Sequence, residues 1–191
     1  MNHTEFLRLV QYRVANVAIG PSTLRNQGAS GVNNAARGFL ASLDLGELSS
    51  IVPADYPKLL ARWTDALVEQ LPTGARKWGT ARKAINVFMV EVFLNRFLAE
   101  EYDLDRFGDV LETPLDSEAN KEMKRLGGQR RLPGWYGIVR LTPADSEKFQ
   151  SYASFLAAKH ELRRATLDLI LWRHFEASPS APPGAESEVT A

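Results

Sequence analysis

The feature that most constrains the fold is a segment, residues 84–99, that is apolar on almost every side. Its sequence, AINVFMVEVFLNRFLA, is interrupted only by Asn86, Glu91, Asn95 and Arg96. An α-helix that is hydrophobic all round is buried in the centre of a fold. We therefore expect this segment to form a central helix, and we expect each polar side chain buried with it to have a partner.

The rest of the chain also has helical patterns, and we find no convincing strand and no internal repeat. Further helices are predicted over residues 4–18, 33–43, 56–70, 116–126 and 162–175, and after Thr142-Pro143, an N-cap followed by proline at the first helical position. Residues 46–57 contain two prolines and are predicted to be a connector. The sequence thus predicts an all-α fold.

Length and composition limit the class of protein. We expect one helical domain over residues 1–176, with subregions 1–70 and 71–176, and a disordered tail over residues 177–191. Lys plus Arg and Asp plus Glu both number 23, so only local clusters of charge can indicate a nucleic-acid partner. The absence of cysteine excludes disulfides, thiolate-held zinc and Cys-ligated iron–sulfur clusters. We expect no metal and no other cofactor.

Neither a membrane segment nor a signal peptide is predicted. No run reaches the roughly 18 apolar residues that a membrane helix needs. The first 20 residues lack a basic region followed by an uninterrupted apolar core. We expect a cytoplasmic, monomeric protein without a membrane partner.

Basic residues cluster in two places. The first cluster lies within residues 76–83, which contain Gly79 and Thr80 together with Arg76, Lys77, Arg82 and Lys83, and no acid. The second lies within residues 121–140, where Glu122 is the only acid beside Lys121, Lys124, Arg125, Arg130, Arg131 and Arg140. Such clusters form either a solvated face or a surface that binds phosphates.

Lys83 and Asp116 each stand at the predicted start of a helix, and we predict that they face one pocket. A desolvated lysine amine is neutral and nucleophilic, and it can form a Schiff base. An aspartate across the same pocket can stabilise a developing cation or transfer a proton. The alternative is a solvated lysine and an aspartate that only caps its helix.

Two other features are candidates for ligand contacts. Asp168 interrupts the apolar run LDLILW, and a carboxylate there needs a helix N-terminus, an arginine or a ligand as partner. Arg25, Asn26 and Gln27 precede Gly28 in a loop rich in planar hydrogen-bonding side chains. This loop is either a solvated turn or a set of groups that contact the edge of a ligand.

Three stretches, ARKAINVF, ETPLDSEANKEMKRL and RATLDLILW, together resemble the helix–hairpin–helix DNA glycosylase superfamily. The chain is most similar to the archaeal GO (8-oxoguanine) glycosylase branch, over roughly residues 71–175. The resemblance implies that Lys83 is the nucleophile and that Asp116 activates it and stabilises the sugar cation. It further implies that Asp168 and Trp172 contact a flipped base. Residues 74–82 would then form a hairpin that binds DNA phosphates, through Arg76, Lys77, Gly79, Thr80 and Arg82.

The chain also resembles bacterial anti-phage relatives of that branch, which remove bulky modified cytosines such as glucosylated hydroxymethylcytosine from phage DNA. This resemblance implies a DNA N-glycosylase, a hydrolase whose partner is double-stranded DNA with a modified base. One alternative is an 8-oxoguanine repair glycosylase with a lyase step. The other is a helical module without catalysis that binds DNA, or that binds a protein through Trp135 and Tyr136.

Overall fold

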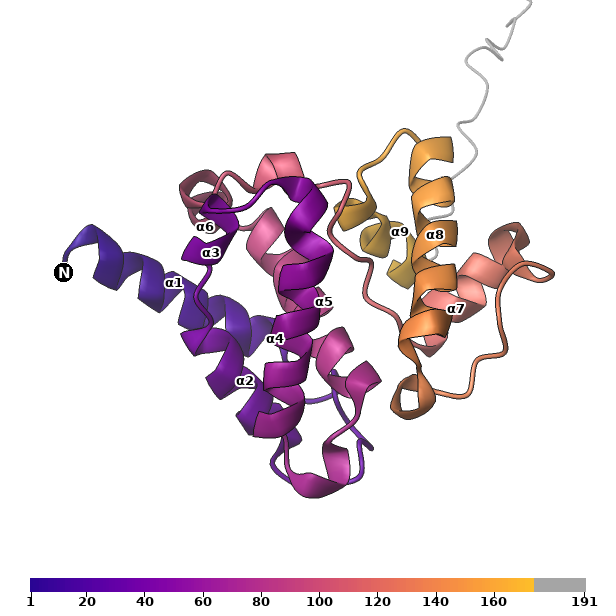
Figure 1. Cartoon of the computed structure of the whole chain (residues 1–191), viewed down its shortest axis with the longest axis horizontal. Coiled ribbons are helices and arrows are strands. Elements are labelled where there is room, and N and C mark those ends of the chain that lie inside the picture. The colour runs from indigo at the N-terminus through magenta and orange to yellow at the C-terminus, as the bar shows by residue number, and fades with distance from the viewer. Residues whose placement is uncertain (174–191) are drawn as a thin grey trace, which may run out of the picture.

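The computed structural model describes the backbone of residues 1–173 and the side chains of residues 1–171. The described part contains helices and no strand (Figure 1), which confirms the predicted all-α class. The predicted disordered tail, residues 177–191, and the side chain of Trp172 lie outside the described residues. No helix of the described part combines the length and the hydrophobicity needed to span a membrane.

The helices of the described part follow one another with short connections. They are α1 (His3–Ala18), α2 (Val32–Ser42), α3 (Gly46–Ser49), α4 (Tyr56–Gln70), α5 (Trp78–Leu94), α6 (Arg96–Glu101), α7 (Ser117–Met123), α8 (Pro143–Lys159) and α9 (Leu167–Arg173). Short 3-10 turns include η1 (Pro53–Asp55), η2 (Thr73–Ala75), η3 (Leu104–Phe107), η5 (Ile138–Arg140) and η6 (Arg164–Thr166), and a π turn, η4 (Lys124–Gly128), follows α7.

The helices enclose two hydrophobic cores, which we call the first and second lobes. The first lobe contains α1 to α6 and extends to Leu111, and the second contains α7 to α9 and begins at Leu115. Figure 1 shows the two lobes side by side, joined by a connector, residues 112–116. The change of core therefore falls in this connector.

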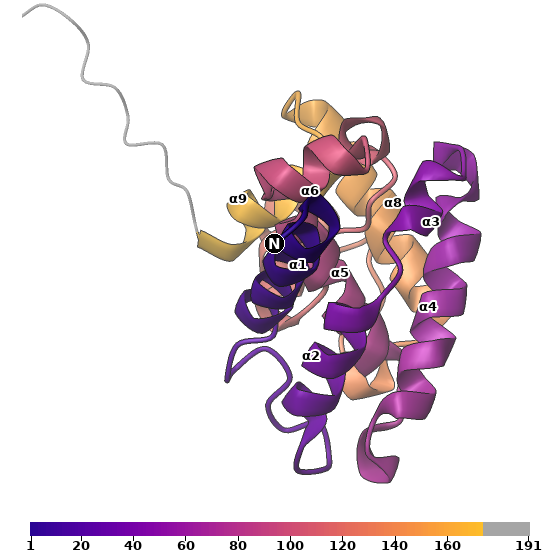
Figure 2. The ribbon, with the colours of Figure 1, turned by 90° about the vertical axis from the view of Figure 1, so that its left-hand side faces the viewer.

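Helix α5 is the centre of the first lobe, and α1, α2 and α4 surround it (Figure 2). It begins at Trp78, earlier than predicted, and ends at Leu94. The predicted helix over residues 84–99 is in fact two helices, because Asn95 is extended and its side chain caps α6 by accepting a hydrogen bond from the Leu98 amide.

Gly79 lies inside the first turn of α5 and is buried there. A Cβ atom at this position would collide with the carbonyl oxygen of Ile138 and would lie 3.0 Å from the Cβ atom of Leu141. The turn η5 of the second lobe therefore packs directly on the start of α5. Gly79 therefore permits this close approach, and its contact with DNA stays a prediction.

We predict that Gly79→Ala lowers the free energy of unfolding by about 1–3 kcal/mol, the usual cost of overpacking a well-packed site. Gly38 in α2 is the matched control, because a Cβ atom there meets nothing within 4 Å. Gly38→Ala should raise the free energy of unfolding by up to about 1 kcal/mol through helix propensity. Urea unfolding of both variants measures the difference, and equal effects would contradict the packing argument.

Candidate active site

Lys83 and Asp116 meet in the structure. Lys83 lies in the second turn of α5, one turn later than predicted, and Asp116 caps the start of α7. The Lys83 Nζ atom lies 3.3 Å from Asp116 Oδ2, and the two side chains are 13% and 28% exposed. The pair thus joins the first lobe to the connector at a place that remains partly open to solvent.

The two carboxylate oxygens of Asp116 have different partners. Oδ1 accepts hydrogen bonds from the backbone amides of Glu118 (3.0 Å) and Ala119 (2.9 Å), whereas Oδ2 contacts Lys83. Oδ1 is thus the N-cap acceptor of α7. Asp116 therefore caps α7 and contacts Lys83 at the same time, each with a different carboxylate oxygen.

Asp168 is the third ionisable group near this pair. Burial is the main cause that raises its pKa to about 7, and the charges of Asp116 and Glu91 raise it further, while Lys83 opposes them. These effects show that the Asp168 carboxyl on α9 lies within electrostatic reach of Lys83 and Asp116. A group that titrates near neutral pH beside a lysine and a second acid is a common feature of active sites.

The same three groups lie beside the open side of α5. Between Gly79 and Val92, only Arg82 and the row formed by Lys83, Val87 and Glu91 are not fully buried. The members of this row are spaced by four residues, so they follow one line along the helix. With a rise of 1.5 Å per residue, Glu91 stands about 12 Å along the axis from Lys83.

The loop that contains residues 25–28 reaches α5 through one side chain. Gln27 is buried, and its Oε1 atom accepts a hydrogen bond of 2.7 Å from Thr80 Oγ1, one turn before Lys83. The backbones of Gly28 and Gly74 are in close contact, which fixes the loop against η2. Sequence reasoning missed this contact, because nothing in the local pattern links Gln27 to Thr80.

The other two residues of the loop lie elsewhere. Arg25 and Asn26 are exposed and line a hollow of about 260 Å³ together with Asn33 and Asn34. Lys83 and Asp116 do not line this hollow. The structure therefore brings only Gln27 close to the Lys83 pair.

Arg82 and Thr80, predicted as DNA contacts, face inward instead. Arg82 donates two hydrogen bonds to Glu112, of 2.9 and 3.0 Å, and a third to Thr64, and its guanidinium lies 5.1 Å from the ring centroid of Trp78. The Arg82 side chain is 11% exposed and that of Glu112 is 15% exposed. Sequence reasoning failed here because the partner of Arg82 lies 30 residues away.

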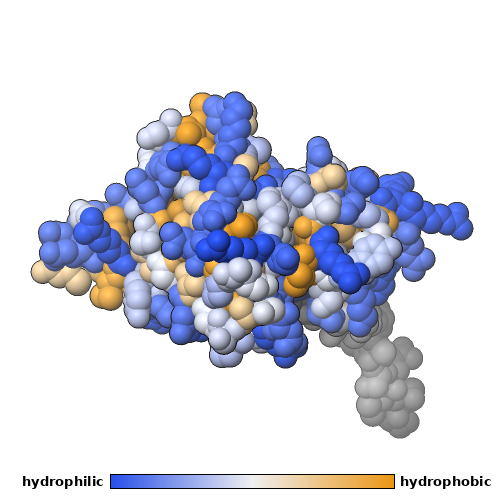
Figure 3. Space-filling model, turned by 60° about the horizontal axis from the view of Figure 1, so that its bottom comes forward, coloured by the Kyte–Doolittle hydropathy of each residue, from blue (hydrophilic) through white to orange (hydrophobic). Residues whose placement is uncertain are grey.

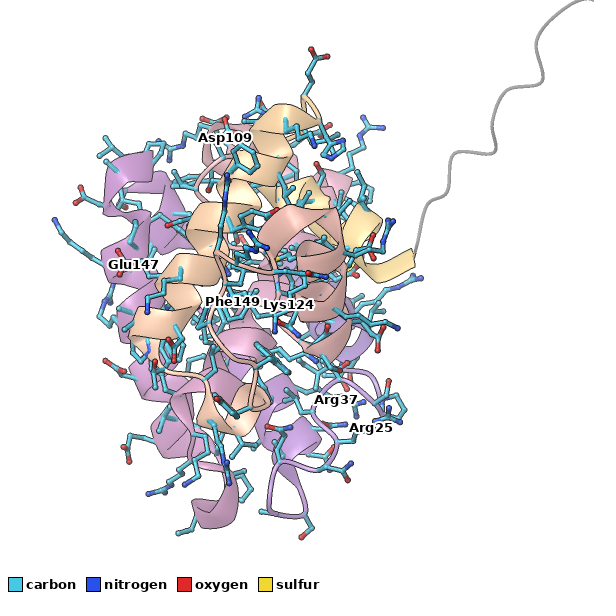
Figure 4. All side chains as sticks on the ribbon, turned by 90° about the vertical axis from the view of Figure 1, so that its right-hand side faces the viewer. Arg25, Arg37, Asp109, Lys124, Glu147 and Phe149 are labelled. Atoms are coloured by element: carbon cyan, nitrogen blue, oxygen red, sulfur yellow. The ribbon has the colours of Figure 1, made fainter. Side chains whose placement is uncertain are left out.

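Several cations do reach the surface. Arg76 and Lys77 are exposed in the hairpin between α4 and α5, where Arg76 also lies 3.5 Å from Glu69. Figure 3 shows that the face carrying this hairpin is mostly hydrophilic, with small hydrophobic patches. In Figure 4, Lys124 from the second lobe lies on the same side of the molecule as Arg25 and Arg37.

Within residues 1–173, no group of His, Asp and Glu side chains is arranged to hold a metal ion. No family model, curated protein or solved structure matches the chain. Any function must therefore be argued from the arrangement of the residues themselves.

We predict that Arg82→Met lowers the free energy of unfolding by about 3–5 kcal/mol, because it leaves the buried Glu112 carboxylate without its partner. Arg96, which pairs with Glu100 on the surface of α6, provides the control. Arg96→Met should change the free energy of unfolding by less than about 1 kcal/mol. Chemical denaturation measures both, and a small effect at Arg82 would show that its ion pair is not structural.

A second prediction concerns Asp168 and pH. Its pKa in the folded protein, about 7, lies above its ordinary value of 3.8, so the stability it contributes is present at low pH and is lost as the pH rises through 7. An asparagine side chain in its place does not titrate. We therefore compare the free energy of unfolding of Asp168→Asn with that of wild type at each pH. The difference, variant minus wild type, should be about 1–3 kcal/mol larger at pH 8 than at pH 5.

Urea unfolding at the two pH values measures this difference. The exposed Asp65 on α4 is the control, and Asp65→Asn should show the same effect at both pH values. A pH-independent effect of Asp168→Asn would contradict a raised pKa at this position.

Proposed function

We propose that this protein is a DNA glycosylase that extrudes a modified base from the duplex and cleaves its N-glycosidic bond. The observation that carries the proposal is the contact of 3.3 Å between Lys83 Nζ and Asp116 Oδ2, with the Asp168 carboxyl within electrostatic reach. The order of the three sequence motifs supports the same function. Base extrusion is required because the target atom is inaccessible inside a duplex.

The chemistry uses these three side chains. The ammonium of Lys83 transfers a proton to the Asp168 carboxylate, and the neutral amine attacks C1′ of the extruded nucleotide. The bond between C1′ and the base breaks, and the base leaves with the bonding electrons and takes up a proton. Asp116 stabilises the positive charge on the sugar, while Asp168, which titrates near pH 7, is suited to provide that proton.

Surface cations support the contact with DNA. Arg76 and Lys77 project from the hairpin of the first lobe, and Arg140 is exposed on η5, which packs on the start of α5. Phosphate contacts of this kind position a protein on the duplex without selecting a sequence. The zero net charge of the chain limits this binding to the local surface.

A bulky modified cytosine of phage DNA is the substrate that we propose, in a role in anti-phage defence. The row from Lys83 to Glu91 extends about 12 Å along α5, which is more than two helical turns and longer than a pyrimidine ring. A base with a large substituent would reach the far end of this row. There the carboxylate of Glu91 accepts hydrogen bonds, which suits the hydroxyl groups of a sugar.

We predict that Asp116→Asn and Lys83→Gln each slow base release at least about 100-fold, the lower limit for loss of an acid, base or nucleophile. Asparagine caps a helix as well as aspartate does, so Asp116→Asn removes the charge and keeps the start of α7. Lys121→Gln on the surface of α7 is the control and should retain activity. Abasic sites are measured in plain DNA, 8-oxoguanine DNA and glucosylated phage DNA.

The same assay separates the mechanisms and the alternatives. Trapping of a protein–DNA adduct by borohydride identifies Lys83 as a covalent nucleophile. Full base release by Lys83→Gln would instead mean that Lys83 positions the substrate and Asp116 directs water. If wild type binds DNA but makes no abasic sites in any of the three DNAs, the protein is a binding module and the glycosylase proposal fails.

A protein contact through the loop before η5 is the remaining alternative. Trp135 packs on Phe149, with 5.6 Å between ring centroids, so only Tyr136 of the two aromatic residues is open, at 76% exposed. This alternative is selected if the protein binds a protein partner with an affinity that does not change with salt concentration, and does not bind DNA.

A further inference from the structure

A cavity of about 380 Å³ lies between the two lobes, within the size range of ligand sites. It is bounded by α4, the start of α5, the connector and α8, and Figure 1 shows the connector running between α4 and α8. Arg82 lines this cavity, whereas Lys83, the next residue of α5, projects about 100° away around the helix axis. The cavity is therefore distinct from the candidate active site.

Tyr56 provides an unused hydrogen-bond donor in the wall of this cavity. Its side chain is fully buried, and its hydroxyl has no partner within the described part of the chain. Burial, the main cause, raises the pKa of Tyr56, so the hydroxyl keeps its proton and remains a donor. The charges of Glu112, Arg82 and Arg164 also act on this pKa, which places the hydroxyl among them.

Arg164 provides a positive charge in the same wall, and the negative charges of Glu112 and Asp109 act on it without a direct ion pair. Its guanidinium donates to the carbonyl oxygens of Val110 and Leu111 and to the hydroxyl of Ser154, and it forms no ion pair with another residue of the described part. These bonds use three of its five N–H groups. Burial lowers the pKa of Arg164, and a buried charge normally has a partner of opposite sign.

Two acceptor groups in the interior of the cavity, those of Glu112 and Gln150, are already occupied. Both oxygens of Glu112 accept from Arg82, and Oε2 also accepts from Asn86. The amide of Gln150 is bonded at both ends to the backbone of Thr113. The interior therefore offers two kinds of unused donor, the Tyr56 hydroxyl and the remaining N–H groups of Arg164, and Arg164 has no direct ion pair. Such a site suits a negatively charged ligand that accepts hydrogen bonds.

We infer that the cavity between the lobes binds a small oxyanion, a carboxylate or a phosphate, through the Tyr56 hydroxyl and the guanidinium of Arg164. Such an anion would link α4 of the first lobe to α8 of the second. Its binding should therefore stabilise the folded protein by mass action. The exposed Glu147 stands at the mouth, on α8 (Figure 4), and its charge disfavours large polyanions such as DNA.

Isothermal titration and thermal unfolding of the full chain test this site, with sodium phosphate and sodium acetate each compared with sodium chloride at equal ionic strength. We expect phosphate, acetate or both to raise the Tm of wild type above its value in chloride. The anion with the lower Kd identifies which oxyanion the cavity takes. Tyr56→Phe should weaken its binding about tenfold or more, because one hydrogen bond to a charged group is lost.

Tyr56→Phe should fold normally, since it removes a hydroxyl that has no partner. Tyr136→Phe is the matched control, because it removes an exposed hydroxyl, and it should bind the anion as wild type does. No shift of Tm beyond that in chloride would overturn the inference, and so would equal Kd values for wild type and Tyr56→Phe. A Tyr56→Phe variant that is less stable than wild type in chloride would also overturn it, because a bound water would then already satisfy the hydroxyl.

Discussion

Two adjacent ion pairs hold the connector against α5, and the rest of the arrangement depends on them. Arg82 pairs with Glu112 and Lys83 pairs with Asp116, so neighbouring cations of one helix hold both ends of the segment that leads to the second lobe. The side chains of Arg82 and Lys83 point in directions about 100° apart around the helix axis, so they hold the connector on two different sides of α5. The candidate active site lies on one side of it and the cavity between the lobes on the other.

The two pairs differ in what they can do chemically. An arginine stays charged in proteins, so the Arg82–Glu112 pair is suited only to holding structure. A lysine amine, unlike a guanidinium, can act as a nucleophile, and the Lys83 Nζ atom lies 3.3 Å from Asp116 Oδ2. The greater exposure of Asp116 leaves this pair accessible to a substrate, whereas Glu112 is largely enclosed. Chemistry is therefore expected at Lys83 and not at its neighbour.

Local signals in the sequence predicted part of this arrangement. The bounds of α4 and the start of α8 at Pro143 agree with prediction, because amphipathic spacing and an N-cap followed by proline are local features. The break at Asn95 was missed, since an asparagine inside an apolar run does not reveal that its side chain caps the next helix. Likewise, the basic run before residue 84 predicted a turn, although residues 79–83 are helical and residues 79–81 are buried.

Asp168 lies in a position where an ionised carboxylate lowers the stability of the fold. The sequence indicated that a carboxylate inside LDLILW needs a partner, and the structure places Asp168 in the first turn of α9, among the charges of Lys83, Asp116 and Glu91. Two of these charges repel it, and burial adds to the cost of ionising it, so its pKa rises to about 7. An aspartate in this position is unfavourable to folding above that pH. A group that is costly to the fold yet titrates near neutral pH beside a lysine is the kind of group that the proposed proton transfer needs.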